Sequence, residues 1–296
     1  MAQKRLITRR SLLALGAYCL SPAAGAAEER FFDSVGVRIR YIEEGWGEPV
    51  VLVHGYTSNA DAQWTQTGVL QALASRYRVI ALDARGHGSS GKPHDPAQYG
   101  PEMGLDILRL LNHLDIARAH IVGYSMGAHI VAQLVTTHPE RFLTAMLGGA
   151  PGRFSWSLED QQRVEREAAE MEQGLLRSQI LRLWPHGEPP PTEGRIRELS
   201  ATQLAGQDPR ALAAIRRSNS AQVVTLTQMA AITVPTLGVV GTADPYLSQF
   251  LKLKAVMPQL DLVTIEAASH SSAPDRPELT QAVLAFLRAH SAMPDR

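Results

Sequence analysis

Short apolar runs alternate with amphipathic stretches along most of this 296-residue chain, and this rhythm limits what the chain can fold into. Three of the apolar runs are "PVVLVHG" at 49–55, "RVIALD" at 78–83 and "AHIVGY" at 119–124. The stretches that follow them place apolar side chains at helical spacing, at 60–76, 103–114 and 126–137. Strands that are apolar on both faces and alternate with helices form a mainly parallel sheet covered on both sides. We therefore predict an α/β fold.

The rhythm is interrupted in the third quarter of the chain. Charged helical stretches such as "DPRALAAIRRS" and the proline-rich "PHGEPPPTEG" replace it there, and it returns with "VPTLGVVGTAD" at 234–244. Near the start, residues 30–45 are typical of a hairpin that adds an antiparallel edge to the sheet. We predict a core made of residues 27–150 and 233–296, with a helical insertion at 151–232.

The first 26 residues have the composition of an export signal. A basic start is followed by a short apolar run and a small-residue end in "KRLITRRSLLALGAYCLSPAAGAAEE". The pair Arg9 and Arg10 before "SLL" resembles the twin-arginine signal of bacteria. We expect cleavage near Ala26 and a periplasmic or secreted protein. A surface helix or a membrane anchor is the alternative, although the apolar run is too short to span a bilayer. Lipidation at Cys19 is disfavoured because Tyr18 precedes it.

Loss of the signal would leave a mildly acidic chain, with 25 basic against 29 acidic residues. Such a surface gives no reason to expect a nucleic-acid partner or stable membrane insertion after cleavage. The only cysteine, Cys19, would leave with the signal, so we expect no disulfide and no thiolate metal ligand. No cofactor and no metal are expected.

A serine lies between two glycines where the strand at 119–124 meets the next helix. The stretch "GYSMG", from Gly123 to Gly127, has the G-x-S-x-G spacing of a nucleophile elbow. Its glycines allow a sharp turn that lifts the Ser125 hydroxyl out of the sheet. The backbone N–H of Met126, at the start of the helix, is then free to stabilise an oxyanion.

A serine needs a base and a group that orients the base. His270 follows a late strand in the loop "EAASHSSAPDRPEL", and Asp244 ends the preceding strand in "VVGTADPY". The order Ser125, Asp244, His270 is the order found in hydrolases with such an elbow. Three other aspartates suit the acidic role less well. We expect Asp83 to make structural loop contacts, Asp261 to lie within a strand, and Asp275 to be the N-cap of the last helix.

A second oxyanion donor is expected after the strand at 49–55. The turn marked by His54 and Gly55 can aim the N–H of Tyr56 at the same point as that of Met126. We expect His54, His87 and His94 to lie on this side of the sheet, where they can line a pocket. Four histidines that lie in or beside the predicted helices and strands are expected to be structural: His113, His120, His129 and His138.

The stretch "LDARGHGSSGKP" at 82–93 contains a G-x-G-x-x-G spacing, which suggests a dinucleotide site. Such a site must open a helix directly after the first strand of its unit. Here Gly91 is followed by "KPHDPAQYG", whose two prolines prevent a helix from starting there. We therefore reject the dinucleotide interpretation.

With these motifs placed, the chain resembles the α/β-hydrolase fold family over residues 30–150 and 232–290. The family's D-x-R-G-x-G-x-S stretch is matched by Asp83, Arg85, Gly86, Gly88 and Ser90. The resemblance implies acyl transfer, because Ser125 separates the chain from relatives with an aspartate or cysteine nucleophile. It also implies that the insertion at 151–232 is a helical cap, whose apolar residues include Phe154, Trp156, Leu183 and Trp184 and can roof the pocket.

The sequence thus predicts a metal-free serine hydrolase that cleaves a small-molecule carboxylic ester or lactone. Ser125 is expected to attack, His270 to act as base and acid, and Asp244 to orient the imidazole. Carbon–carbon bond hydrolysis of ring-fission products and a cofactor-free, haloperoxidase-like perhydrolase remain alternatives, because both use the same triad. A non-catalytic binding protein of the same fold is a further alternative. The sequence leaves the oligomeric state open.

Overall fold

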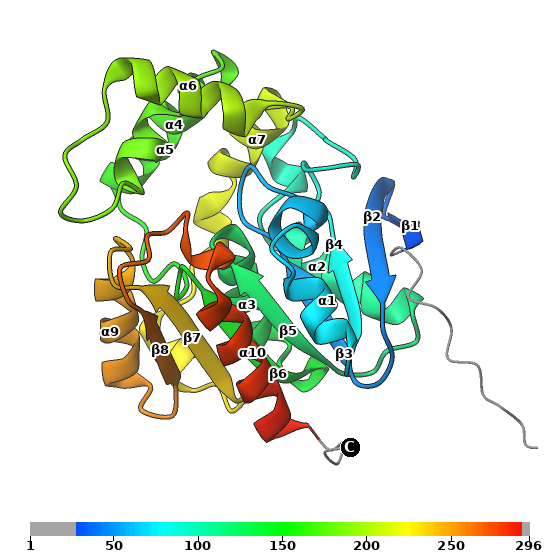
Figure 1. Cartoon of the computed structure of the whole chain (residues 1–296). Helices are drawn as coiled ribbons and strands as arrows, with labels where there is room; N and C mark the ends of the chain where they lie inside the picture. The colour runs from blue at the N-terminus through cyan, green and yellow to red at the C-terminus, as the bar shows by residue number, and fades with distance from the viewer. Residues whose placement is uncertain (1–27, 292–296) are drawn as a thin grey trace, which may run out of the picture.

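The computed structural model describes residues 28–291, and the predicted export signal lies outside them. Its centre is an eight-stranded sheet with the spatial order β1-β2-β4-β3-β5-β6-β7-β8 (Figure 1). The strands are β1 (Glu28–Ser34), β2 (Val37–Glu44), β3 (Pro49–Val53), β4 (Arg78–Leu82), β5 (Ala119–Tyr124), β6 (Phe142–Gly148), β7 (Thr236–Gly241) and β8 (Asp261–Ile265). The six strands β3 to β8 are parallel, whereas β1 and β2 add the expected antiparallel edge.

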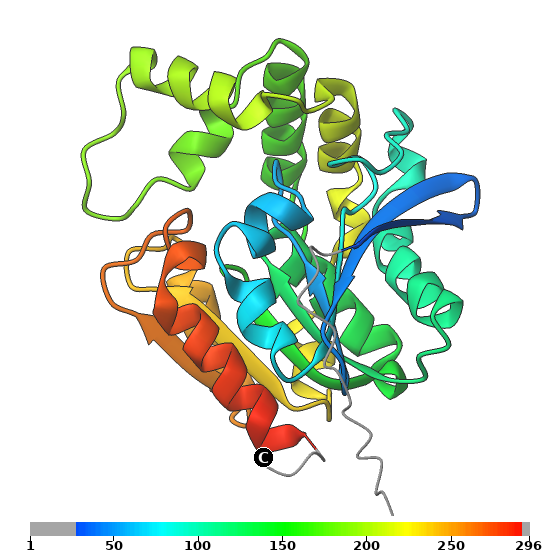
Figure 2. The same cartoon turned by 45° about the vertical axis from the view of Figure 1, so that its right-hand side comes forward.

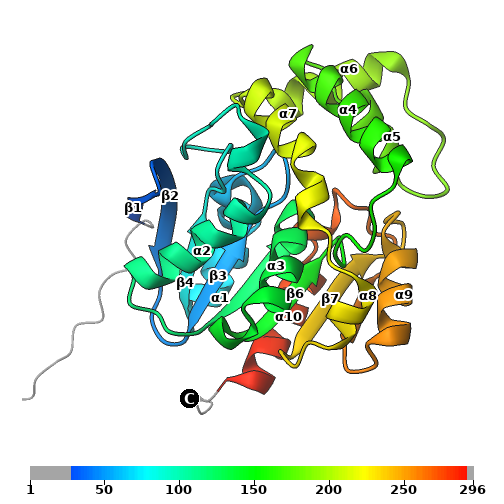
Figure 3. The same cartoon turned by 180° about the vertical axis from the view of Figure 1, so that it is seen from behind.

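Helices cover both faces of the sheet. One face carries α1 (Val69–Ala74) and α10 (Pro277–His290), and the other carries α2 (Pro101–His113), α3 (Met126–Thr137), α8 (Leu226–Ala230) and α9 (Leu247–Val256) (Figure 3). Each face has its own cluster of buried apolar side chains, because every central strand points alternate residues to opposite sides. The α/β fold predicted from the sequence is confirmed.

One expected helix is broken. The stretch 60–76, predicted as a single helix, forms a π-helical turn (Asp61–Thr65) and then α1. Gly68 separates them with φ of +77°, a left-handed conformation that glycine adopts without the steric cost of a Cβ atom. The apolar residues expected on one side of this stretch, Val69, Leu70 and Leu73, are buried on α1, which begins directly after the glycine.

Between β6 and β7 the chain forms α4 (Leu158–Glu172), α5 (Arg177–Arg182), α6 (Glu193–Leu204) and α7 (Pro209–Arg217), followed by α8. We call α4–α7 the cap helices. They stand over the carboxyl ends of the parallel strands, whereas α8 packs against α9 beside the sheet (Figure 2). The first of them, α4, begins with a capping box, in which Ser157 and Asp160 satisfy each other's backbone N–H groups.

Candidate active site

Ser125 occupies a strained turn between β5 and α3. Its φ of 53° and ψ of −108° lie outside the regions that most L-residues adopt. A Cβ atom on Gly123 would lie 2.4 Å from the Gly127 carbonyl oxygen, and one on Gly127 would lie 2.1 Å from the carbonyl oxygen of Val53. Only glycine therefore fits at either position, which is the physical reason for the G-x-S-x-G spacing.

Three predicted site residues lie in a hydrogen-bonded chain. Nε2 of His270 lies 2.9 Å from Oγ of Ser125, and Nδ1 of the same ring lies 2.9 Å from Oδ2 of Asp244. Asp244 is fully buried, and its other carboxylate oxygen accepts the backbone N–H of Tyr246 at 2.9 Å. Both oxygens of the carboxylate are therefore satisfied, and one of them faces the imidazole.

Tyr124, the residue before Ser125, links the elbow to the loop that carries His270. Its hydroxyl donates to the His270 carbonyl oxygen at 2.6 Å. Burial raises the pKa of the Tyr124 phenol well above its ordinary value, with the charges of Asp244 and Asp275 adding to the rise. The phenol stays protonated and keeps its role as donor.

The other aspartates have different surroundings. Asp83 accepts the N–H groups of Ala60 and Ser89 and pairs with Arg40, so it fixes the loops around it. Asp261 is exposed on β8. The expectation that Asp275 caps the last helix is wrong: Asp275 lies in a 3-10 turn, and the N-cap of α10 is Arg276. The intervening turn moves the start of the helix beyond the reach of the aspartate.

The two candidate oxyanion donors, Tyr56 and Met126, line the same cavity as Ser125. Met126 is the first residue of α3, so its N–H has no acceptor within the helix. His54 holds the turn before Tyr56: its Nδ1 lies 2.7 Å from the Gly55 carbonyl oxygen, and its Nε2 accepts the N–H of Ala84. Burial lowers the pKa of His54, which keeps this ring neutral and able to accept.

A cavity of about 590 Å³ opens beside Ser125 and extends under the cap helices. His54, His87 and His94 were expected to line it, and this expectation is wrong. The first two are buried within the loops, and the third pairs with Asp208 at the surface. His129, expected to be structural, does line the cavity.

Of the apolar cap residues predicted to roof the pocket, Leu183 and Trp184 line the cavity, but Phe154 and Trp156 do not. The sequence reasoning missed the arginines of this wall altogether, which are Arg153, Arg163, Arg182, Arg195 and Arg216. Arginine is usually a surface residue, so an apolar pattern in the sequence does not indicate that these side chains line the cavity.

Within residues 28–291, no cluster of His, Cys, Asp or Glu is arranged to hold a metal ion. In the same range, no helix has both the length and the apolar character needed to cross a membrane.

The chain is similar in sequence to known proteins over part of its length. A relative from Metapseudomonas resinovorans, 2-hydroxy-6-oxo-6-(2'-aminophenyl)hexa-2,4-dienoic acid hydrolase, is 34% identical over 128 residues, which are 42% of this chain and 43% of the relative. An acetyltransferase component of an acetoin cleaving system from Cupriavidus necator is 37% identical over 134 residues, 43% of this chain and 35% of that protein. The chain thus matches less than half the length of either relative.

Solved structures extend the likeness to most of the fold. The enol-lactonase from Burkholderia xenovorans LB400 superposes with a TM-score of 0.72, at 24% identity, over 88% of this chain and all of that one. The model of the α/β-hydrolase fold family matches residues 48–277, which include most of both predicted halves of the core and the whole insertion between them. The chain belongs to the α/β-hydrolase fold family.

Proposed function

We propose that this α/β-hydrolase cleaves a carboxylic ester or lactone through an acyl-enzyme on Ser125. The proposal depends on one observation above all: the hydrogen-bonded chain from Asp244 through His270 to Ser125 ends at a cavity. A serine hydroxyl is a weak nucleophile on its own, and an adjacent imidazole held by a buried carboxylate is what activates it.

In the first half-reaction, Oγ of Ser125 attacks the acyl carbonyl carbon while its proton passes to Nε2 of His270. The carbonyl oxygen becomes an oxyanion, which the N–H groups of Tyr56 and Met126 stabilise. The bond to the leaving oxygen then breaks, and His270 returns the proton to that oxygen. Asp244 holds the imidazole in the required tautomer and stabilises its charged form.

In the second half-reaction, a water molecule gives one proton to His270 and attacks the acyl carbon. The ester bond to Ser125 breaks, and the serine oxygen recovers a proton from His270. The products are a carboxylic acid and an alcohol, or a hydroxy acid from a lactone. The two half-reactions need no group beyond water and the named side chains.

Carbon–carbon bond hydrolysis is the second candidate, and the similarity to the dienoic acid hydrolase favours it. A screen of the purified protein separates the two, using p-nitrophenyl esters of several chain lengths, lactones and a ring-fission dienoate. The ester and lactone proposal predicts turnover of the first two groups, and turnover of the dienoate alone would replace it. A fluorophosphonate probe should label Ser125 and no other serine.

We further propose that the protein is exported through the twin-arginine route. The support is the sequence of residues 1–26, which the structure does not describe. Changing Arg9 and Arg10 together to lysine should leave the precursor in the cytoplasm, because this route reads the guanidinium pair rather than the charge alone. Cell fractionation with detection of the processed form measures the outcome. Unchanged export of the double variant would point to the general secretory route.

A further inference from the structure

The lining of the cavity is rich in arginine, and we call this part of it the arginine wall. Four guanidinium groups gather there from separate parts of the chain: Arg153 after β6, Arg163 on α4, Arg182 on α5 and Arg216 on α7. A fifth, Arg195, is exposed and pairs with Glu198. Two carboxylates that also line the cavity, Glu188 and Asp275, are exposed to solvent. Buried arginines normally occur paired, so the partners of the first four decide what this wall can bind.

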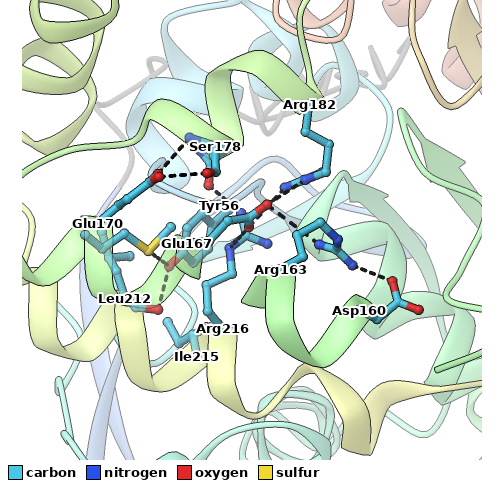
Figure 4. A network of polar contacts seen from close by, with 12 residues as sticks. Tyr56, Asp160, Arg163, Glu167, Glu170, Ser178, Arg182, Leu212, Ile215 and Arg216 are labelled. Carbon is cyan, nitrogen blue, oxygen red and sulfur yellow. Dashed lines mark hydrogen bonds and ion pairs between the residues drawn. The ribbon is translucent and has the colours of Figure 1, made fainter. Parts of the chain in front are cut away.

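Three of the four share one buried carboxylate, Glu167, on α4 (Figure 4). Oε1 of Glu167 lies 2.8 Å from Nε of Arg182, and Oε2 lies 3.1 Å from Nε of Arg216. Arg163 lies farther, at 3.7 Å, and has its own partner in Asp160 at 2.7 Å. Burial works to raise the pKa of Glu167, but Arg216 and Arg182 outweigh it and hold that pKa at about 2.

Arg153 has no such partner. Within residues 28–291 no carboxylate pairs with it, and its Nε is buried without a hydrogen-bond partner. Its guanidinium lies 5.6 Å from the centroid of the Trp156 ring. Burial has the largest effect on the pKa of Arg153 and lowers it, Tyr246 opposes that effect, and Arg216, Arg163 and Arg182 lower the pKa as well, so that it lies at about 10.

The charges of this wall do not balance. Among residues 28–291, only two carboxylates, Glu167 and Asp160, lie within ion-pair distance of the four guanidinium groups, which leaves two positive charges without a paired carboxylate. A desolvated cation without a counter-charge is unfavourable, and the contact of Arg153 with the Trp156 ring offsets only part of that cost. An anion bound in the cavity would supply the missing charge.

The arginine wall is adjacent to the reacting atoms. Tyr246 connects them: its ring centroid lies 5.6 Å from that of His270, and Nη1 of Arg182 donates to its hydroxyl at 3.2 Å. His129, one turn after Ser125 on α3, lies 6.3 Å from the same tyrosine ring, and its Nδ1 has no hydrogen-bond partner among the described residues. Burial, together with the charges of Arg153, Arg182 and Arg216, lowers the pKa of His129 well below its ordinary value, so this ring is neutral.

We propose that the substrate carries a carboxylate, and that Arg153 binds it in the cavity while Ser125 attacks the ester or lactone carbonyl of the same molecule. This inference rests on the proposed function and specifies its substrate class. Arg182 contributes positive potential and remains tied to Glu167. The neutral ring of His129 lines the same cavity. A planar guanidinium with free N–H donors matches a carboxylate in shape as well as charge.

The test compares esters that differ only in one charge. On the acyl side, p-nitrophenyl hydrogen glutarate is matched with its neutral amide, p-nitrophenyl 4-carbamoylbutanoate. On the alcohol side, 4-carboxyphenyl butyrate is matched with 4-carbamoylphenyl butyrate. We expect kcat/KM of the wild type to favour the anionic member of at least one pair by about 10- to 100-fold, since a hydrogen bond to a charged group is worth about 1.5–3 kcal/mol. The pair that shows the preference tells which side of the scissile bond carries the anion.

Arg153→Gln should abolish that preference, because the anionic ester loses the guanidinium that the proposal places against its carboxylate. Arg153→Lys should keep part of it, because the charge remains and the paired donors do not. The matched control is Arg177→Gln, which removes an exposed cap arginine paired with Glu193 and should leave the preference intact. Arg153→Gln should unfold at the same temperature as the wild type or a higher one, whereas a structural arginine would destabilise when removed.

A binding measurement on a variant without the nucleophile tests the anion site independently of the proposed hydrolysis. Glutarate should bind to Ser125→Ala in titration calorimetry, and at least tenfold more weakly to the variant that also carries Arg153→Gln. If no ester is cleaved, this Arg153-dependent binding decides the matter alone, so the anion site can stand while the hydrolase proposal falls. If esters are cleaved, the substrate pairs decide. Equal kcat/KM for charged and neutral members, or a preference that survives Arg153→Gln, would overturn the anion site and leave the hydrolase intact.

Discussion

The catalytic candidates of the core are largely buried and the arginines of the cavity wall are half-buried, and the two groups are paired differently. In the core, Asp244 and Ser125 each lie at hydrogen-bond distance from one ring nitrogen of His270, and the second carboxylate oxygen of Asp244 accepts a backbone N–H. In the wall, three guanidinium groups share Glu167 and Arg153 has no carboxylate. The polar groups of the candidate site on the sheet thus satisfy one another, whereas the wall carries positive charge that the proposed anionic substrate would balance.

Removal of the nucleophile should give the largest effect and show how self-contained the core is. We expect Ser125→Ala to lower kcat by about 10⁴ to 10⁶, because the lost hydroxyl forms the covalent bond and nothing replaces it. The unfolding temperature should stay within a few degrees of the wild type. Ester hydrolysis at a third of the wild-type rate would contradict the assignment of the nucleophile.

Asp244→Asn should lower kcat by up to about 10⁴, since an amide in this place favours the wrong tautomer of His270. The matched controls are Asp83→Asn, Asp261→Asn and Asp275→Asn, measured for both kcat and unfolding temperature. These three should lose activity only as far as they lose stability. A catalytic loss at any of them that exceeds the loss at Asp244 would move the acidic role to that residue.

The core could be predicted from the sequence because its signals are local. The elbow shows in the spacing of Gly123, Ser125 and Gly127, since each glycine avoids a backbone clash that any side chain would make. Asp244 and His270 follow apolar strands, and parallel strands end at the same edge of a sheet, so position along the chain indicates position in space. The predicted and observed ends of a helix differ where a glycine interrupts the helical pattern, as Gly68 does.

The cavity wall could not be predicted in the same way. Glu167 is 15 residues from Arg182 and lies on a different helix, so no local spacing predicts their pairing. The packing of α4, α5 and α7 brings these charges together. The insertion contains many arginines, and the sequence does not show which of them pair with Glu167. His129 is the exception: its spacing of four residues from Ser125 places both on one side of α3, and this signal was available.

Removal of the shared carboxylate should affect stability more than chemistry. Glu167→Gln leaves Arg182 and Arg216 buried without a counter-charge, and we expect the free energy of unfolding to fall by about 3–5 kcal/mol. Urea unfolding followed by circular dichroism measures it. Glu193→Gln, which removes an exposed carboxylate paired with Arg177, should change it by less than about 1 kcal/mol. Equal losses in the two variants would mean that the buried group of charges does not hold the cap helices together.

The contribution of Glu167 should also depend on pH, in a direction that its pKa fixes. This carboxyl titrates at about 2 in the folded protein and at its ordinary value of 4.5 when unfolded. The unfolded state therefore takes up its proton first as the pH falls, and the stability that ionised Glu167 provides is complete above pH 4.5 and declines toward pH 2. The difference in unfolding free energy between the wild type and Glu167→Gln should shrink by about 2 kcal/mol from pH 5 to pH 3.

Carboxylates common to both proteins cancel in this difference, which isolates the one group that was changed. The readout is a series of urea titrations of the wild type and Glu167→Gln at pH 7, 5, 4 and 3. A difference that stays constant over the series would show that Arg182 and Arg216 do not lower the pKa of Glu167. Arg153→Gln in the same series serves as the contrast: it removes no carboxylate, so its difference from the wild type should not shrink with the pKa of Glu167.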